Sequence, residues 1–472
     1  MTTLRFHGSA AVLLLPLALF VAVTAKLFIS EAAFDLTGLA AAGVLTLFSG
    51  SLLAKSPSEY WKAAVRGASS ELTGTVVLIL IASGIFSAIM KASGVADGLV
   101  FLGGMLHLTG HAFTAFVLLA SSLMAAATGS SIGTLLAAMP IFFPAGVALG
   151  ADPAMLAGAV LSGAIFGDNL APVSDVTVIS SVTQRFRDGT PADIAGVVRT
   201  RLPYAMTALA VSMPVYAFMG ASRPVSEAAL SGDASALLML VPVAVLIAVA
   251  VRTRDVLMAI SAGAVTGTAT GLLIGRLSFA TIFAADDGRL SGFLISGISN
   301  VSPIILLCVT LFAFTGIVRE AGVPDMMAKA LEAGSAGRPS ALRTELFLSA
   351  ATLVVTTLFA AVTSASVALV GSLTDDIGRA SNVHPYRRSH ILSGLANSLP
   401  VLMPFSAFVL ITMAAVSGLE GAAAVTPFTL MTAAFYPIAL FLVFGFMVLT
   451  GTGRMMETPE PEAAEAKTAT AL

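Results

Sequence analysis

Two carboxylates lie inside one apolar stretch of the sequence. Asp168 and Asp175 both fall within residues 155–180, which are otherwise apolar and long enough to cross a bilayer as a helix. An ionised carboxylate at the centre of a span costs about 2.5 to 3.5 kcal/mol on insertion scales, so these side chains should face protein, water or a bound cation. Such a carboxylate can hold either a proton or a cation, which is the chemistry of an ion-coupled carrier.

The same stretch contains residues that interrupt a helix and oxygen atoms that could bind a cation. Pro172 cannot donate a backbone hydrogen bond, and Gly167 weakens the helix just before it. We therefore predict that the chain is unwound around Asn169 to Pro172, near the middle of the membrane. Freed carbonyls, with Ser174, Thr177 and the carboxylates, would form an all-oxygen environment suited to a hard cation. The predicted sodium ligands are Asp168, Asn169, Ser174 and Asp175.

Small hydroxylated residues interrupt two further apolar regions, and we predict that they line the path of the transported species. They are Thr128, Ser130, Ser131, Thr363, Ser364 and Ser366. An alternative interpretation is tight helix packing through small residues, which is common in membranes. Asn397, followed by the helix breaker Pro400, is expected to approach the Asp168 to Asp175 region from the other half of the chain.

Several of these polar residues also have structural interpretations. Asp168 or Asp175 could cap a half-helix, with Ser174 as a turn residue, and Asn397 could be a bystander. Asp375 and Asp376 precede a basic loop, so we expect a solvated pair at the cytoplasmic surface. The histidines show no metal-ligand spacing and are expected at interfaces or in loops. These are His107, His111, His384 and His390.

Membrane-spanning helices must position these residues. Apolar residues make up 57% of the 472-residue chain and charged residues only 11%, more hydrophobic surface than a soluble core could bury. Apolar runs of about 17 to 20 residues recur, without the alternation of a membrane barrel. We predict an all-α polytopic membrane protein with about 12 to 14 transmembrane segments and broken helices. Residues 112–149 and 346–378 could cross as paired segments or form re-entrant hairpins.

Lysines and arginines gather on one side of the predicted segments. With a cytoplasmic N-terminus, most of them, including Arg201, Arg387 and Arg388, fall in cytoplasmic positions. The exceptions are Lys26, Lys91, Arg223, Arg276 and Arg289. This predicts a multi-pass protein of the cell (inner) membrane with both termini in the cytoplasm. Residues 457–472 are acidic and alanine-rich, and we expect a disordered cytoplasmic tail.

Two short motifs recur at one separation. Gly94-Val95 matches Gly322-Val323, and Asn169 with Pro172 matches Asn397 with Pro400, both 228 residues apart. An odd number of predicted segments lies between the matches, so the two halves would be inverted in the membrane, as in many secondary transporters. The predicted repeats are residues 1–228 and 229–456.

Other functional classes find little support. The formal charge of −2 and the lack of a basic patch with interleaved aromatics argue against nucleic-acid binding. The single cysteine, Cys308, excludes a disulfide framework and a thiol metal cluster. No phosphate-binding loop, catalytic triad or zinc signature can be assembled, so we expect neither an enzyme nor a cofactor. The expected partners are membrane lipid, a small cation, protons and a small organic solute, and a homo-oligomer stays open.

The segment 167–177 resembles the NhaC-type sodium/proton antiporter family. That family's motif reads Gly-Asp-x-x-Ser-Pro-x-Ser-Asp-Thr-Thr, and this chain has Gly-Asp-Asn-Leu-Ala-Pro-Val-Ser-Asp-Val-Thr. Residues 128–131, Thr-Gly-Ser-Ser, are similar to a second pattern of the family. Ala171 replaces the motif serine and Val176 its first threonine, and each change removes a hydroxyl oxygen.

The resemblance implies a secondary transporter of the wider ion-transporter superfamily. It carries Asp168, Pro172, Ser174, Asp175 and Thr177 onto the functional site. The hypothesis is a sodium/proton antiporter that works by alternating access, with protons and the cation competing for the carboxylates. An alternative is a proton- or sodium-coupled transporter of a small organic acid or amine, and an ion channel is a more distant one.

Overall fold

The computed structural model describes residues 4–8, 10–27, 36–221, 233–253, 255–286, 289–323 and 340–457. These residues are helical apart from connecting segments and one two-stranded antiparallel hairpin of β1 (Ala284–Asp286) and β2 (Arg289–Ser291). Within this part of the chain, nine helices are long and apolar enough to cross a membrane, or up to eleven if each of two bent helix pairs is one span. Three more apolar stretches are shorter. The predicted all-α membrane class is confirmed.

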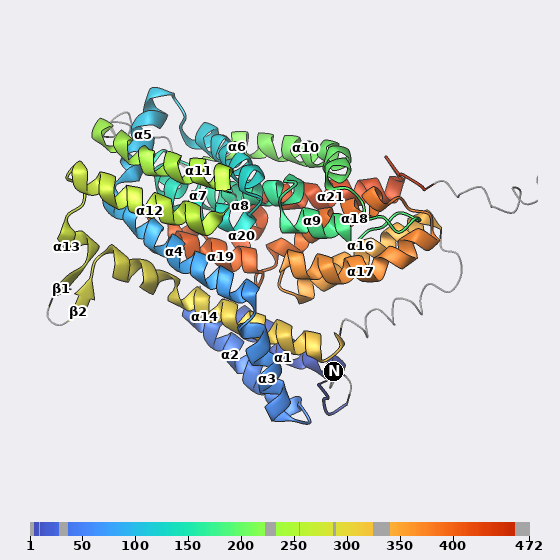
Figure 1. The fold of residues 1–472 in the computed structure, drawn as a ribbon. Coiled ribbons are helices and arrows are strands. Elements are labelled where there is room, and N and C mark those ends of the chain that lie inside the picture. The colour runs from blue at the N-terminus through green and yellow to red at the C-terminus, as the bar shows by residue number, and fades with distance from the viewer. Residues whose placement is uncertain are drawn as a thin grey trace, which may run out of the picture.

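The N-terminal helices form a group that packs against one long helix. In Figure 1, α14 runs between this group and the main body, and it contacts α2, α3 and α4. Glycines allow the close approach: a Cβ on Gly67 would lie 2.3 Å from the Phe312 carbonyl oxygen and 2.9 Å from Gly316. The elements of this group are η1 (Ala10–Leu13), α1 (Leu14–Ala25), α2 (Leu36–Leu53) and α3 (Pro57–Ala68), with α14 (Phe293–Glu320). From there α4 (Glu71–Ser93) continues into the main body, where α5 (Val95–Met105) packs against α7 and η4.

The centre of the molecule is built around α8, which packs most extensively against α6. A Cβ on Gly167 would lie 2.2 Å from Ala125 Cβ, so this glycine lets the two helices touch. Gly167 was expected at the helix break, but it lies inside α8, which continues to Leu170. The elements here are α6 (Gly110–Thr128), α7 (Ser131–Ala148), α8 (Pro153–Leu170), α9 (Asp175–Val182) and α10 (Ile194–Met219).

Two further groups complete the fold. On one side of the centre, α11 and α12 pack against each other, with α12 also against α4. On the other, α16, α17 and α18 pack together (Figure 1). The first group comprises η4 (Ala234–Met239), α11 (Leu240–Thr253), α12 (Val256–Leu273) and α13 (Phe279–Ile282). The second and the C-terminal elements are α16 (Ala341–Leu358), α17 (Thr363–Ala380), α18 (Pro385–Ala396), η5 (Leu399–Leu402), α19 (Ala407–Val416), η6 (Ala422–Ala424), α20 (Pro427–Ala433) and α21 (Phe435–Thr450).

Helix breaks are observed near Pro172 and Pro400, but Asn169, which was expected in the unwound segment, still belongs to α8. The chain between α8 and α9, residues 171–174, is not helical. The second break separates α18, which continues through η5, from α19, and the two parts meet at 53°. Pro172 lies in the first break and Pro400 in η5, as expected for residues that cannot continue a helix ladder.

The turn between α6 and α7 contacts the first break, and the turn between α16 and α17 contacts the start of α19, after the second break. A Cβ on Gly129, between α6 and α7, would lie 2.6 Å from Val173 Cγ2 and 3.0 Å from Ser174 N. The backbone N–H of Ala407, at the start of α19, donates to the carbonyl of Ala360 between α16 and α17, at 2.8 Å. The helices also cross-pack in pairs, α7 with α19 and α17 with α9.

These paired contacts are what two related halves would produce. Gly94 and Gly322, the first repeat match, both have φ 70° at the end of a helix, a backbone conformation that favours glycine. The inverted repeat with its boundaries at 1–228 and 229–456 stays a prediction. Apart from Glu457, the predicted tail lies outside the described residues.

Candidate ion-binding site

Asp168 lies buried in the last turn of α8, directly before the break. The residue is only 5% exposed. Oδ1 accepts a hydrogen bond from the Ser174 hydroxyl at 2.7 Å, and Ser131 at the start of α7 is a further neighbour of the carboxylate. Oδ2 is buried and has no hydrogen-bond partner in the described structure. One oxygen of a buried carboxylate is therefore free to bind a ligand.

The side chains of Asp168 and Ser174 bond to each other and form no helix cap. Ser174 is the N-cap residue of α9, but its side chain forms no capping bond and donates to Asp168 instead. The capping interpretation of Asp168 is therefore wrong. Asp175 is the first residue of α9 and is exposed, so the structure does not bring it into the buried centre. Its charge is still close enough to interact with that of Asp168.

Asn169 and Thr177 are buried and engaged by other protein groups. Asn169 Nδ2 donates to the Tyr436 hydroxyl at 3.3 Å, and its Oδ1 accepts from Ser393 Oγ at 3.3 Å. Thr177 Oγ1 donates to the carbonyl of Asp168 at 3.3 Å, across the break. Asn169 thus links the broken span to α18 and α21, and Thr177 links the two sides of the break.

A buried arginine, which the sequence analysis placed at the cytoplasmic surface, occupies the centre of this polar region. Arg201 of α10 is 0% exposed. Its Nη1 donates to the Asn169 carbonyl at 2.7 Å and to Ser393 Oγ at 2.8 Å, and its Nη2 donates to Ser389 Oγ at 3.1 Å. The surface placement is wrong because these oxygens replace water around the guanidinium. Its position inside the span Ile194–Met219 was the signal available in the sequence.

Two tyrosines, also missed from the sequence, fix the helices around Asp168. The Tyr216 hydroxyl donates to the Ala433 carbonyl at 2.7 Å and shares a 2.8 Å hydrogen bond with Ser162 of α8. Tyr436, at the start of α21, holds Asn169. Both lie in apolar helices, where the sequence offers no sign of which polar group each would meet.

Asn397 shares a polar face of α18 with two serines that contact this centre. Ser389, Ser393 and Asn397 recur every fourth residue, so they lie on one helical face. The first two contact Arg201, and Ser393 reaches Asn169. Asn397 is 0% exposed, and neither atom of its amide has a partner in the described structure. It is therefore a second free polar side chain, one turn beyond the contacts with the broken span.

The hydroxyl residues of the predicted transport path have mostly local partners. Ser130 caps α7 by accepting from the Gly133 N–H at 3.1 Å, and Ser366 Oγ donates to the Val362 carbonyl at 2.8 Å. Thr363 is buried and Ser364 is half-buried. Their role in a path stays a prediction.

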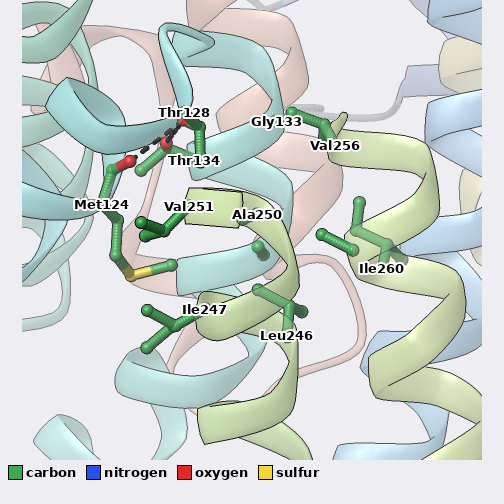
Figure 2. A pocket seen from close by; sticks show the side chains of 12 residues that line it. Met124, Thr128, Gly133, Thr134, Leu246, Ile247, Ala250, Val251, Val256 and Ile260 are labelled. Carbon is green, nitrogen blue, oxygen red and sulfur yellow. Dashed lines mark hydrogen bonds between the residues drawn. The ribbon is translucent and has the colours of Figure 1, made fainter. Parts of the chain in front are cut away.

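Thr128 instead borders an apolar pocket between α6 and α7 on one side and α11 and α12 on the other. Figure 2 shows its hydroxyl directed to the Met124 carbonyl and to Thr134, at 3.0 and 3.4 Å. Aliphatic side chains, including Leu246 and Ile260, form most of the remaining lining. These side chains offer a cation no ligands.

A charged cluster lies near the start of α18 and corrects three sequence-based expectations. Asp375 is 6% exposed and pairs with Arg388 at 2.6 Å, so it is not a solvated surface residue; the side chain of Asp376 lies outside the described part. Arg387 is also fully buried and pairs with Glu345 at 2.9 Å. His390 is 0% exposed rather than interfacial, because α18 is enclosed by other helices.

The centre therefore offers one buried carboxylate. Among the described residues, no group of three or more His, Cys, Asp or Glu side chains could hold a metal ion. A small cation or a proton is the ligand that the free oxygen of Asp168 could accept.

Part of the chain is similar to proteins described as antiporters. Residues 3–221 match the model of the Na+/H+ antiporter family. The chain is 31% identical over 176 residues to the malate-2H(+)/Na(+)-lactate antiporter of Bacillus subtilis, covering 37% of this chain and 36% of that protein. It is 28% identical over 280 residues to the Na(+)/H(+) antiporter NhaC of Alkalihalophilus pseudofirmus, covering 54% of this chain and 58% of that protein. The chain thus spans 36% and 58% of these two curated relatives.

A solved structure of Neisseria gonorrhoeae MtrF aligns with 82% of this chain and 84% of that chain, at 12% identity and a TM-score of 0.39. That similarity is too weak to establish a common helix arrangement. The family resemblance of the Asp168 motif, in contrast, is confirmed by the sequence matches. Residues 3–221, which contain the broken span and Arg201, are thus similar to the Na+/H+ antiporter family.

Proposed function

We propose that this protein is a secondary transporter that exchanges sodium, or a similar cation, for protons by alternating access. The observation that carries the proposal is the buried carboxylate of Asp168, which has one free oxygen at a broken membrane span. A proton and a cation cannot occupy that oxygen together, so each displaces the other. Competition at one carboxylate is sufficient for antiport.

The helix breaks and hairpin tips supply the surroundings of the proposed exchange. Ser174 orients one oxygen of Asp168, and Asn397 offers an unbonded amide from the opposite half of the chain. A cation between Asp168 and Asn397 would be held by both halves, so relative movement of the halves would expose it to one side and then to the other. Asp175, exposed at the start of α9, would guide cations toward the buried carboxylate.

Transport in proteoliposomes tests this function. We expect an imposed sodium gradient to drive proton movement in the opposite direction. Lithium and potassium are compared with sodium in the same assay. Asp168→Asn keeps the size of the side chain but removes its titratable charge, so exchange should fall to the level of empty liposomes. Exchange at the wild-type rate in Asp168→Asn would refute the assignment of the site.

A second candidate function is coupled transport of a small organic acid. It is favoured by the similarity over 176 residues to the malate-2H(+)/Na(+)-lactate antiporter. The same liposomes loaded with malate or lactate distinguish the two: organic-acid transport requires counterflow of the labelled acid, whereas cation/proton antiport proceeds without it. Neither function involves enzymatic catalysis or a resident cofactor.

We also propose that the protein lies in the cell membrane with both termini in the cytoplasm. The distribution of lysine and arginine supports this orientation. The buried arginines 201, 387 and 388 no longer contribute to that count, because they are not loop residues. Labelling of single cysteines introduced at exposed loop positions, in intact cells and in inverted vesicles, tests the orientation.

A further inference from the structure

The partners of Arg201 are unusual for a buried guanidinium. All acceptors of its hydrogen bonds are uncharged oxygens, from α8, α9 and α18. Fully buried cations normally pair with a carboxylate, because desolvation of an unpaired charge is costly. Arg201 holds the carbonyl of Asn169, the residue that follows Asp168, and both Asp168 and Arg201 are buried. Asp168 and Arg201 are therefore a carboxylate and a fixed cation in one buried centre.

The oxygens bound by Arg201 are those that a dehydrated metal cation would use. They include the carbonyl freed at the helix break and the Thr177 hydroxyl, both expected from the sequence to surround sodium. Because the guanidinium already holds them, the unbonded oxygen left for an incoming cation at the break is Asp168 Oδ2. The ligand set for a carried ion is thus small and contains one negative charge.

We propose that Arg201 is a specificity-determining residue: a fixed cation that limits the transport site to one added positive charge, so that it accepts one proton or one monovalent cation and rejects divalent cations. This inference rests on the proposed function. With Asp168 ionised, the carboxylate and guanidinium cancel, and one proton or one sodium ion brings the centre to a single positive charge. A divalent cation would leave two uncompensated positive charges in a buried site, where repulsion is poorly screened.

A purely structural role for Arg201 predicts a different pattern. As a link between α10, the break and α18, it would contribute to stability, but its removal would not alter which ions bind. Arg201→Gln removes the charge and keeps donor atoms, whereas Arg201→Lys keeps the charge and loses the planar fork. Ser393→Asp places a carboxylate where a serine oxygen now lies 2.8 Å from Arg201, which neutralises the fixed cation without removing it.

The experiment measures thermal unfolding of the purified full chain in detergent, with increasing sodium chloride or calcium chloride at constant ionic strength. For wild type we expect stabilisation by sodium and none by calcium. For Arg201→Gln and Ser393→Asp we expect calcium to raise the unfolding temperature. The calcium concentration that gives half of this increase should be lower, by about tenfold or more, than any calcium concentration that stabilises wild type. Arg201→Lys should keep the wild-type pattern. Arg199→Gln, an exposed arginine of the same helix, is the matched control and should also keep it.

The double variant Asp168→Asn with Arg201→Gln should lose the calcium response, which locates the gained binding at Asp168. The proposal is overturned if neither Arg201→Gln nor Ser393→Asp gains calcium binding, or if Arg201→Lys gains it too. If Arg201→Gln does not fold, Ser393→Asp alone decides. Calcium that stabilises wild type as well as sodium does would overturn the role of Arg201 alone. Absence of sodium-driven proton flux in wild-type liposomes would overturn the proposed exchange instead.

Discussion

Replacement of Glu345 by glutamine should destabilise the protein more than any change of a surface ion pair. Glu345 of α16 is 0% exposed and accepts two hydrogen bonds from Arg387, at 2.9 and 3.2 Å, and two from Arg454, at 3.1 and 2.9 Å. Glutamine can accept through one oxygen but carries no charge. Arg387, also 0% exposed, would keep its bonds to the carbonyls of Met447 and Thr452 but lose its counter-charge.

Breaking a buried ion pair costs about 3 to 5 kcal/mol, because one charge stays buried without compensation. Glu320→Gln is the matched control: it removes the partner of Arg66, whose side chain is 55% exposed, and exposed pairs contribute about 0 to 1 kcal/mol. Thermal unfolding of both variants in detergent compares the two losses. We expect a decrease in Tm for Glu345→Gln several times that for Glu320→Gln. Equal decreases would refute the reasoning that burial makes the Glu345 cluster energetically different.

Three further predictions concern the site and its packing. Ser174→Ala removes the 2.7 Å hydrogen bond to Asp168 and should weaken sodium binding by about 1.5 to 3 kcal/mol. The half-saturating sodium concentration should therefore rise, and an unchanged half-saturating concentration would contradict the role of Ser174. Asp175→Asn should reduce proton-linked exchange with little change in Tm, because Asp175 is exposed, and full activity would remove it from the site. Gly167→Ala should cost about 1 to 3 kcal/mol of stability, because its Cβ would collide with Ala125. Gly445→Ala should be nearly neutral, because its Cβ would have nothing within 4 Å. Similar Tm values for the two variants would contradict the packing argument.

Local features of the sequence were sufficient to predict the broken span. Pro172 acts on its own helix, and a carboxylate in an apolar run must be buried against something, so the position of Asp168 follows from a few neighbouring residues. The membrane class follows from composition in the same way. In contrast, Gly167 was misjudged because its effect depends on Ala125 of another helix, which the local sequence does not reveal.

The charged residues show where local reasoning fails. Arg387, Arg388 and Asp375 lie in a segment rich in charges, which is typical of a solvated loop, yet long-range partners bury all three. Glu345 is 42 residues away from Arg387, and nothing in either local sequence indicates the pairing. Arg201 could have been recognised as an arginine within an apolar span, but its contacts with Asn169 and Ser393 depend on how α8, α10 and α18 pack.

The central claim is that Asp168 holds either a proton or a cation. The most direct test measures proton release when sodium is added to the purified protein in weakly buffered detergent solution, over a range of pH. We predict release of up to about one proton per protein molecule in wild type, and none in Asp168→Asn. Sodium binding without proton release in wild type, or equal proton release in Asp168→Asn, would contradict the claim.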